Sequence, residues 1–146
     1  MKLVSIDEGE IEIEMKSELQ GIKENLENII KSKNVKNGKM ECHLPHEVAA
    51  FIWLGWESGL KKDMLNFLKD ILPAGKYKEH DEPGTPFRYN FYQHAQVKLV
   101  GEPTLILQIK DNKLYLGKYQ DIMILEPVFK EIPKLKIFYR LYIFGD

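Results

Sequence analysis

Two runs of alternating polar and apolar residues, one near each end of the chain, constrain the fold most. Residues 8–16 place Ile11, Ile13 and Met15 on one face of an extended chain, and residues 134–144, KLKIFYRLYIF, alternate in the same way. A period of two is typical of β-strands with one buried face. Because a sheet with one apolar face must be covered by another layer, these runs predict packed β-sheets.

Shorter apolar runs predict the remaining strands. The run FIWLGW is apolar at every position except its glycine, which is typical of a strand that is covered on both faces. The sequence KDNK has the composition of a hairpin turn. The other predicted strands are KLVSI (2–6), MECHL (40–44), TLILQI (104–109), LYLG (114–117) and DIMIL (121–125).

Two segments have helical patterns. The first is predicted to begin at a capping box, Ser17-Glu18-Leu19-Gln20, in which the serine and glutamine side chains satisfy free backbone N–H groups. The second is predicted to run from about Ser58 to Leu72, where Pro73 ends it. The apolar stripe of the first helix comprises Leu19, Ile22, Leu26, Ile29 and Ile30, and that of the second comprises Leu60, Met64, Leu65, Phe67, Leu68 and Ile71.

The order of these elements predicts a single α+β domain over residues 1–146. Runs of strands with separate helices are typical of this class. A chain of 146 residues is long enough for one sizeable core. We expect two packed, mostly antiparallel β-sheets, with two long helices covering one face.

Charge and composition argue against several classes of protein. The net charge of −1 provides no electrostatic reason to bind nucleic acid or an anionic membrane. No apolar run approaches the roughly 20 residues that span a bilayer, and the first residues lack an apolar signal segment. The single cysteine, Cys42, excludes an intrachain disulfide and fits a reducing compartment. We therefore expect a cytoplasmic protein without nucleic-acid or membrane partners.

The stretch ECHLPHEVAAFIWLGW contains two of the four histidines, His43 and His46. Residues three apart in a strand point to opposite faces of the sheet. Pro45 also favours extended geometry at Leu44, which precedes it. A local metal chelate made by these two histidines is therefore not expected, and at most one of them serves a site.

The other two histidines, His80 and His94, belong to a long segment without a regular pattern, residues 74–96. A loop of this length in a compact domain is usually functional or disordered, and its many aromatic residues argue against disorder. The chain has no local metal-binding motif, glycine-rich phosphate loop or nucleophile elbow. The residues alone therefore predict a site on this segment without defining its chemistry.

Several short motifs, taken in order, resemble those of the YjbQ family, also called the secondary thiamine-phosphate synthase family. The family has Pro-His-Thr-Thr-Ala at a strand end, which resembles PHEVA at residues 45–49, and a Tyr-x-His signature, which resembles YKEHDE at residues 77–82. The family also has an Asn four residues before a His, and this His leads into Leu-Val-Gly. Asn90, His94 and Leu99-Val100-Gly101 resemble this pattern. Its Leu-Gly-Thr-Trp-Gln and downstream Glu are similar to LGKYQ at residues 116–120 and to Glu126.

This resemblance, which spans roughly residues 8–144, implies a YjbQ-like fold and a homotrimer with sites between subunits. It also implies an enzyme acting on small phosphorylated metabolites, with thiamine-phosphate synthase activity secondary to an unknown main reaction. That activity joins a pyrimidine pyrophosphate to a thiazole phosphate and expels pyrophosphate. Such chemistry needs cations or a metal to stabilise the departing charge.

The residues that match the family's motifs define the expected site. His46, His80 and His94 are expected to converge on one pocket with Asn90, in catalytic roles, while His43 stays outside it. The three imidazoles are also candidate ligands of a divalent metal, Zn²⁺ or Mg²⁺, which is the expected cofactor; acid–base or phosphate-contacting roles are the alternative. The residues assigned to substrate binding are Gln120, Glu126 and Lys98.

The chain also departs from the family's pattern and therefore resembles a divergent member. Glu47 and Val48 replace two threonines, Leu54-Gly55 replaces Asn-Glu, and Gln96 replaces a lysine. A Gly-Pro-Arg segment after the glutamate is also absent. These departures support a second hypothesis, in which the chain is a non-catalytic oligomeric protein that binds a ligand or metal and has kept the fold without the chemistry.

Overall fold

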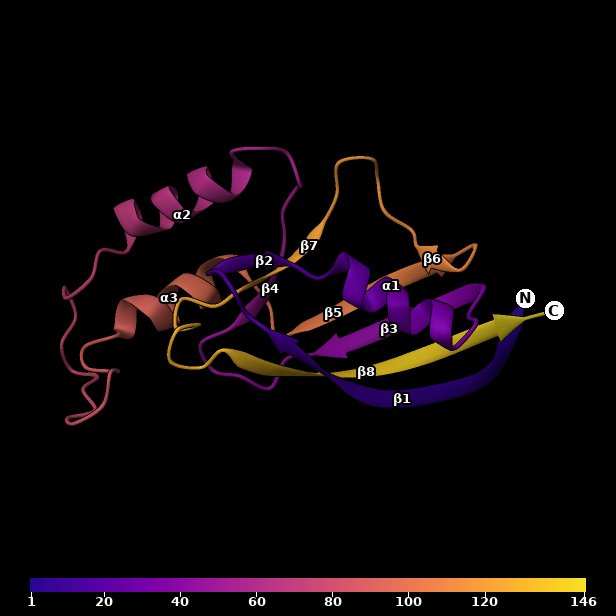
Figure 1. The fold of residues 1–146 in the computed structure, drawn as a ribbon, viewed down its shortest axis with the longest axis horizontal. Helices are drawn as coiled ribbons and strands as arrows, with labels where there is room; N and C mark the ends of the chain where they lie inside the picture. Colours follow the sequence, from indigo (N-terminus) through magenta and orange to yellow (C-terminus); the bar gives the residue numbers. More distant parts are fainter.

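The computed structural model describes residues 1–146 and contains two antiparallel β-sheets and three helices (Figure 1). The five-stranded sheet has the strand order β1-β8-β3-β5-β6, and the three-stranded sheet has the order β2-β7-β4. The predicted α+β fold with two packed sheets is therefore confirmed. The strands are β1 (Lys2–Glu14), β2 (Leu19–Gly21), β3 (Asn37–His43), β4 (Ala50–Trp53), β5 (Thr104–Lys110), β6 (Lys113–Leu114), β7 (Ile122–Leu125) and β8 (Lys134–Gly145), and the helices are α1 (Lys23–Ser32), α2 (Leu60–Ile71) and α3 (Phe91–Val100).

The longest ladder joins the two ends of the chain. Strand β1 pairs with β8 from Lys2 opposite Gly145 to Glu14 opposite Lys134, and both termini lie at the same end of the sheet (Figure 1). The two alternating runs of the sequence thus form neighbouring strands. Their apolar faces point the same way, into the main core.

Both faces of the three-stranded sheet carry buried residues, because every residue of β7 and every residue of β4 except Trp53 is buried. Phe51 and Ile124 point into the main core, which lies between the five-stranded sheet and a layer made by α1 and the small sheet. Ile52 points the other way, into a second core that also contains Leu68 of α2 and Val97 of α3. The small sheet is therefore covered on both faces, as its sequence predicts, and α2 and α3 form its outer cover.

The predicted capping box is wrong. Leu19–Gly21 forms β2, which pairs with β7, and α1 begins only at Lys23. The side chain of Gln20 accepts a hydrogen bond from the backbone N–H of Lys16 at 2.7 Å and donates one to the carbonyl of Glu14 at 3.0 Å. These bonds stabilise the turn between β1 and β2, so the polar residues of the motif serve a turn and not a helix end.

Several strands differ in extent from their predictions. The run FIWLGW, predicted as one strand, is strand only as far as Trp53, where β4 ends. The runs 2–6 and 8–16 form the single strand β1, with a register irregularity between Leu3 and Ser5. The predicted strand 114–117 shrinks to β6, which ends at Leu114. The hairpin before it is confirmed: Asp111 and Asn112 have φ angles of 54° and 64°, which suit a tight turn with a left-handed backbone.

The helices differ from the predicted pair in number and placement. Helix α3 begins inside the segment expected to be irregular and extends beyond it to Val100, and α1 packs on the large sheet while α2 and α3 cover the small one. In α2 only Leu68 of the predicted apolar stripe is fully buried, whereas Phe67 is 50% exposed. No helix combines the length and the apolarity that crossing a membrane requires.

Replacing Leu26 by Ala tests the position of α1 in the main core. Leu26 is fully buried, so its truncation leaves a cavity, and we expect the free energy of unfolding to fall by about 2–5 kcal/mol in urea denaturation. Ile106→Ala is the matched control, because Ile106 is 60% exposed on β5 and should cost about 1 kcal/mol or less. Equal losses in the two variants would contradict this packing.

Candidate functional site

A hollow beside α3 gathers the polar groups that are best placed to bind a ligand. Its volume is about 610 Å³, within the usual range for small-molecule sites. We call it the α3 hollow. Its lining residues are Glu47, His80, Phe91, His94, Ala95, Lys98 and Leu99.

Helix α3 brings His94 and Lys98 to the same face because they are four residues apart. The backbone N–H groups of Gln93 and His94 donate to the carbonyl of Asn90 at the start of the helix. Tyr89, immediately before, has a φ of 54°, so the chain turns sharply into α3. The buried Val97 packs into the second core against the small sheet, whereas His94 and Lys98 line the α3 hollow.

Glu47 connects this helix to the loop that follows β3. Its Oε2 lies 2.8 Å from His94 Nδ1, and its Oε1 lies 3.0 Å from Lys98 Nζ. The Lys98 ammonium also donates to the backbone carbonyl of Glu47 at 2.8 Å. The hydrogen bonds from His94 and then from Lys98 lower the pKa of the Glu47 carboxyl below its usual value, so the carboxylate is ionised at neutral pH.

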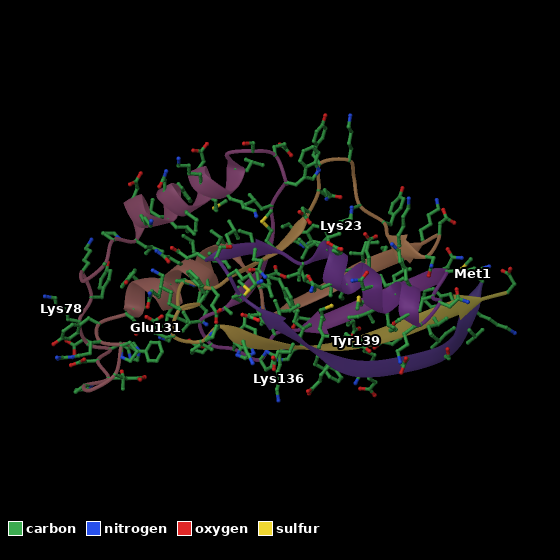
Figure 2. All side chains as sticks on the ribbon, viewed as in Figure 1. Met1, Lys23, Lys78, Glu131, Lys136 and Tyr139 are labelled. Carbon is green, nitrogen blue, oxygen red and sulfur yellow. The ribbon has the colours of Figure 1, made fainter.

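His80 approaches the same site from the long loop between α2 and α3. Its ring meets the His94 ring edge to face, with centroids 4.8 Å apart. The loop is closed by Arg88, whose guanidinium forms two hydrogen bonds to Asp81, at 2.8 and 3.0 Å, and lowers the pKa of that carboxyl. Figure 2 shows Lys78 at the outer end of this loop, far from Lys23 on α1.

An apolar extension adjoins the α3 hollow. A second hollow of about 580 Å³ shares His80, Phe91 and Ala95 with the first, and it is otherwise lined by Leu72, Tyr77 and Glu79. The rings of Tyr77 and Phe91 meet edge to face at 5.3 Å. We call this region the apolar lobe. Polar groups at one end and aromatic rings at the other suit a ligand with a charged group and an apolar body.

His46 lies beside the α3 hollow and not within it. Its Nε2 accepts a hydrogen bond from the backbone N–H of Lys136 at 2.9 Å, and burial lowers its pKa. It lines a separate hollow of about 330 Å³, which shares Glu47 and Lys98 with the first. His43 is exposed, with Nδ1 at 3.3 Å from Thr104 Oγ1. The single chain thus brings His80 and His94 together in the α3 hollow, places His46 in the adjoining hollow, and leaves His43 outside both.

The other predicted site residues lie apart from the α3 hollow. Gln120 accepts a hydrogen bond from Gly117 N–H at 2.8 Å and so closes a turn between β6 and β7. Asn90 is buried, and neither of its amide atoms has a partner. Glu126 is also buried with Oε1 unpartnered, and burial, together with the nearby charge of Glu131, raises its pKa to about 7. Buried polar groups without partners are uncommon and mark candidate ligand contacts.

The single chain does not assemble the predicted three-histidine metal centre. No group of three or more His, Cys, Asp or Glu side chains is arranged to hold a metal ion. The Nε2 of His46 is already engaged by Lys136 and cannot also donate its lone pair to a metal. The metal therefore stays a prediction.

Sequence reasoning missed Glu47 and the apolar lobe. Glu47 stands at a position where the related motif has threonine, so in the sequence it counts only as a departure. A signal is present in the spacing of His94 and Lys98, because two basic residues on one helix face favour a nearby carboxylate. Tyr77 and Phe91 indicate an ordered loop in the sequence, but nothing there identifies them as the walls of a site.

The two-sheet fold with a polar hollow beside a helix defines a small α+β protein with a concave candidate binding site. A family model described as UPF0047 protein YjbQ-like matches residues 7–137. The chain therefore belongs to the YjbQ (UPF0047) family.

Individual relatives agree with this assignment. A UPF0047 protein from Archaeoglobus fulgidus is 28% identical over 109 residues, which cover 75% of this chain and 80% of the relative. A YbjQ-like protein of unknown function from Sulfolobus solfataricus P2 superposes with a TM-score of 0.71 at 20% identity, covering 94% of this chain and 96% of its own. A conserved hypothetical protein from Thermus thermophilus has a TM-score of 0.69 at 19% identity, with coverages of 91% and 98%. At these identities the structural likenesses show the shared fold.

Replacing Glu126 by Gln tests the buried carboxyl. Its pKa of about 7 in the folded protein, against an ordinary 4.5, means that the native state binds the proton more tightly than the unfolded chain. The stability from this proton is therefore complete below about pH 4.5 and is lost as the pH rises through about 7. Glutamine cannot ionise, so the variant should gain roughly 2 kcal/mol over the wild type between pH 4.5 and 8.5, with solvent screening taken into account.

Urea denaturation at both pH values measures this difference. The exposed strand residue Glu10, changed to Gln, controls for the substitution itself. If the difference in unfolding free energy between the wild type and Glu126→Gln is the same at both pH values, the pKa of Glu126 is not raised.

Proposed function

We propose that this YjbQ-family protein is a small enzyme that acts on phosphorylated metabolites at the α3 hollow. The observation that carries the proposal is the meeting of His80, His94 and Lys98 around one hollow with an aromatic extension. The His80 imidazole and the Lys98 ammonium supply the hydrogen-bond donors that phosphate oxygens require. The adjoining apolar lobe suits the ring or chain of a phosphorylated small molecule.

Lys98 is the cation best placed to contact a phosphate. Two of the three ammonium hydrogens are used by the carbonyl and the carboxylate of Glu47, which leaves one for a ligand. His80 has no hydrogen-bond partner in the protein, so both of its ring nitrogens are available. The phosphate is therefore expected between Lys98 and His80, with the organic part of the ligand over Phe91 and Tyr77.

Thiamine-phosphate synthase activity is proposed as a secondary activity of this site. The reaction forms a bond between the pyrimidine methylene carbon and the thiazole nitrogen while the methylene–oxygen bond to pyrophosphate breaks. The leaving pyrophosphate takes the electron pair of that bond, so its growing charge needs nearby donors. Lys98 and the imidazole of His80 are the groups on this chain that fit that role.

A second candidate is a non-catalytic binding protein with the same hollow. The ionised Glu47 supports it, because this carboxylate already neutralises Lys98. The absence of an acidic side chain at Leu54-Gly55, where the related pattern has Asn-Glu, supports it as well. Such a protein would bind phosphorylated molecules without converting them.

The homotrimer is proposed on the family resemblance and on exposed apolar side chains. Phe67 and Ile71 of α2 are 50% and 43% exposed, and the aromatic side chains of Trp53, Trp56 and Tyr119 are also about half-exposed. Trp56 and Tyr119 stack with centroids 5.8 Å apart. Large apolar side chains exposed in this number are typical of surfaces that another subunit covers.

Lys98→Met tests the proposed phosphate contact. Loss of one charge-assisted hydrogen bond should weaken binding of pyrophosphate and of phosphorylated metabolites about tenfold in calorimetric titrations. Lys69→Met, which removes an exposed lysine from α2, is the matched control and should bind as the wild type does.

A chromatographic assay of the same proteins with the pyrimidine pyrophosphate and the thiazole phosphate separates the two candidates. Product formed by the wild type and lost in Lys98→Met supports the enzyme, whereas binding without product supports the non-catalytic protein. Equal binding by both variants would contradict the proposed contact.

Light scattering combined with size exclusion tests the trimer. The wild type should have three times the chain mass of 17.1 kDa, and the double variant Phe67→Glu, Ile71→Glu should shift toward the monomer because charges replace apolar contacts. The double variant Leu3→Glu, Ile6→Glu, which changes exposed apolar residues of β1, is the control and should keep the mass of the wild type. A wild type that elutes with the mass of one chain at micromolar concentration would contradict the trimer.

A further inference from the structure

The bond between Glu47 and His94 determines which ring nitrogen of His94 faces a ligand. Glu47 Oε2 lies 2.8 Å from Nδ1, and an ionised carboxylate can only accept, so in the neutral ring Nδ1 carries the hydrogen. The remaining nitrogen, Nε2, has no protein partner and is left with a free lone pair. The same ring lines the α3 hollow beside His80.

Lys98 holds the carboxylate in this position. Its ammonium donates both to Oε1, at 3.0 Å, and to the backbone carbonyl of Glu47, at 2.8 Å. Glu47 itself is on an exposed loop, where its side chain would otherwise be free to rotate. Lys98 and His94 lie one turn apart on the same helix. The two contacts from Lys98 to Glu47 therefore hold the Glu47 carboxylate at a fixed distance from the His94 ring.

We infer that Glu47 is a positioning residue that holds His94 as a hydrogen-bond acceptor, and that the α3 hollow therefore takes a phosphorylated molecule bearing a hydroxyl or amino group. Lys98 and His80 contact the phosphate, and His94 Nε2 accepts the hydrogen bond of the hydroxyl or amine. Only the identity of the ligand group rests on the proposed function, since the protein alone fixes the tautomer of His94.

The same geometry predicts what an amide does at position 47. In Glu47→Gln, Lys98 can only donate, so it orients the amide oxygen toward itself and the NH₂ group toward His94. His94 Nδ1 must then accept, and the hydrogen moves to Nε2. The reversed ring would present a donor to the hollow in place of an acceptor, as happens when an amide replaces the aspartate of a serine-protease triad.

Long-range ¹⁵N–¹H correlation spectra of the histidine rings test this directly. At about pH 8.5, two units above the ordinary imidazole pKa, the wild type should show His94 with the hydrogen on Nδ1, and Glu47→Gln should change the tautomer ratio about tenfold toward Nε2. The ring of His46, which accepts from Lys136 N–H, is the internal reference and should not change. Glu79→Gln, which removes a charge beside His80 without contacting His94, is the matched control.

A double variant separates orientation from charge. In Glu47→Gln, Lys98→Met nothing fixes the amide, so it can turn its oxygen back toward Nδ1, and part of the wild-type tautomer should return. A wild-type ring with its hydrogen on Nε2, or a ratio unchanged in Glu47→Gln, would overturn the positioning role.

The ligand group is tested with 2-hydroxyethyl phosphate and ethyl phosphate, which differ by one hydroxyl. The wild type should bind the hydroxylated compound several-fold more tightly in calorimetry, because its hydroxyl can donate to His94 Nε2. Equal affinities in the wild type would overturn the assignment of the ligand group. If neither compound binds, the proposed function at this hollow fails, whereas the tautomer result stands or falls by itself.

Discussion

The antiparallel ladder between β1 and β8 is the interaction on which the rest of the structure depends. It pairs the first and last strands, so folding must bring together the two ends of the chain before this surface can be buried. The inner face of the ladder is one wall of the main core, and the free edge of β8 receives β3. Because β3 ends at His43, the ladder also determines where the loop that contains His46 and Glu47 leaves the sheet.

The small sheet determines where α3, and with it the α3 hollow, lies relative to the large sheet. Its strands bury alternate residues in two cores, and the outer core orients α3 through Val97. With Val97 directed inward, His94 and Lys98 face the loop that follows β3, where Glu47 joins them. Packing sets the position of the helix, and three polar contacts to Glu47 set the chemistry of the hollow.

The sequence predicts the strands better than the elements that carry the site. Alternation in β1 and β8 depends only on one face being buried, so it can be read from each run alone. Helix α3 has no apolar stripe: Phe91 and Leu99 are exposed, and the polar Gln96 is buried beside Val97. Its formation depends on the second core, which involves residues distant in the sequence. Of the capping-box residues, Ser17 and Glu18 lie in the turn before β2 and Leu19 and Gln20 lie in β2 itself, because pairing of Leu19 with β7 outweighs a local helix signal.

The candidate site is predictable only in part, for the same reason. The positions of His80 and His94 on one segment point to a common site, and the structure brings their rings together. The partner of His46 is a backbone N–H of β8, which no local pattern could have indicated. Glu47 lies far from His94 in the sequence and adjoins it only because β3 and the small sheet are packed as they are. Contacts of this kind follow from the tertiary fold and not from spacing along the chain.

A crystal structure grown with inorganic pyrophosphate tests the central claim most directly, because it shows where this chain holds a phosphate. The predicted result is a phosphate group in the α3 hollow, within hydrogen-bond distance of Lys98 Nζ and a ring nitrogen of His80, with Glu47 still bonded to His94. Pyrophosphate bound at Gln120 or Glu126 with an empty α3 hollow, or no bound pyrophosphate at saturating concentration, would contradict it.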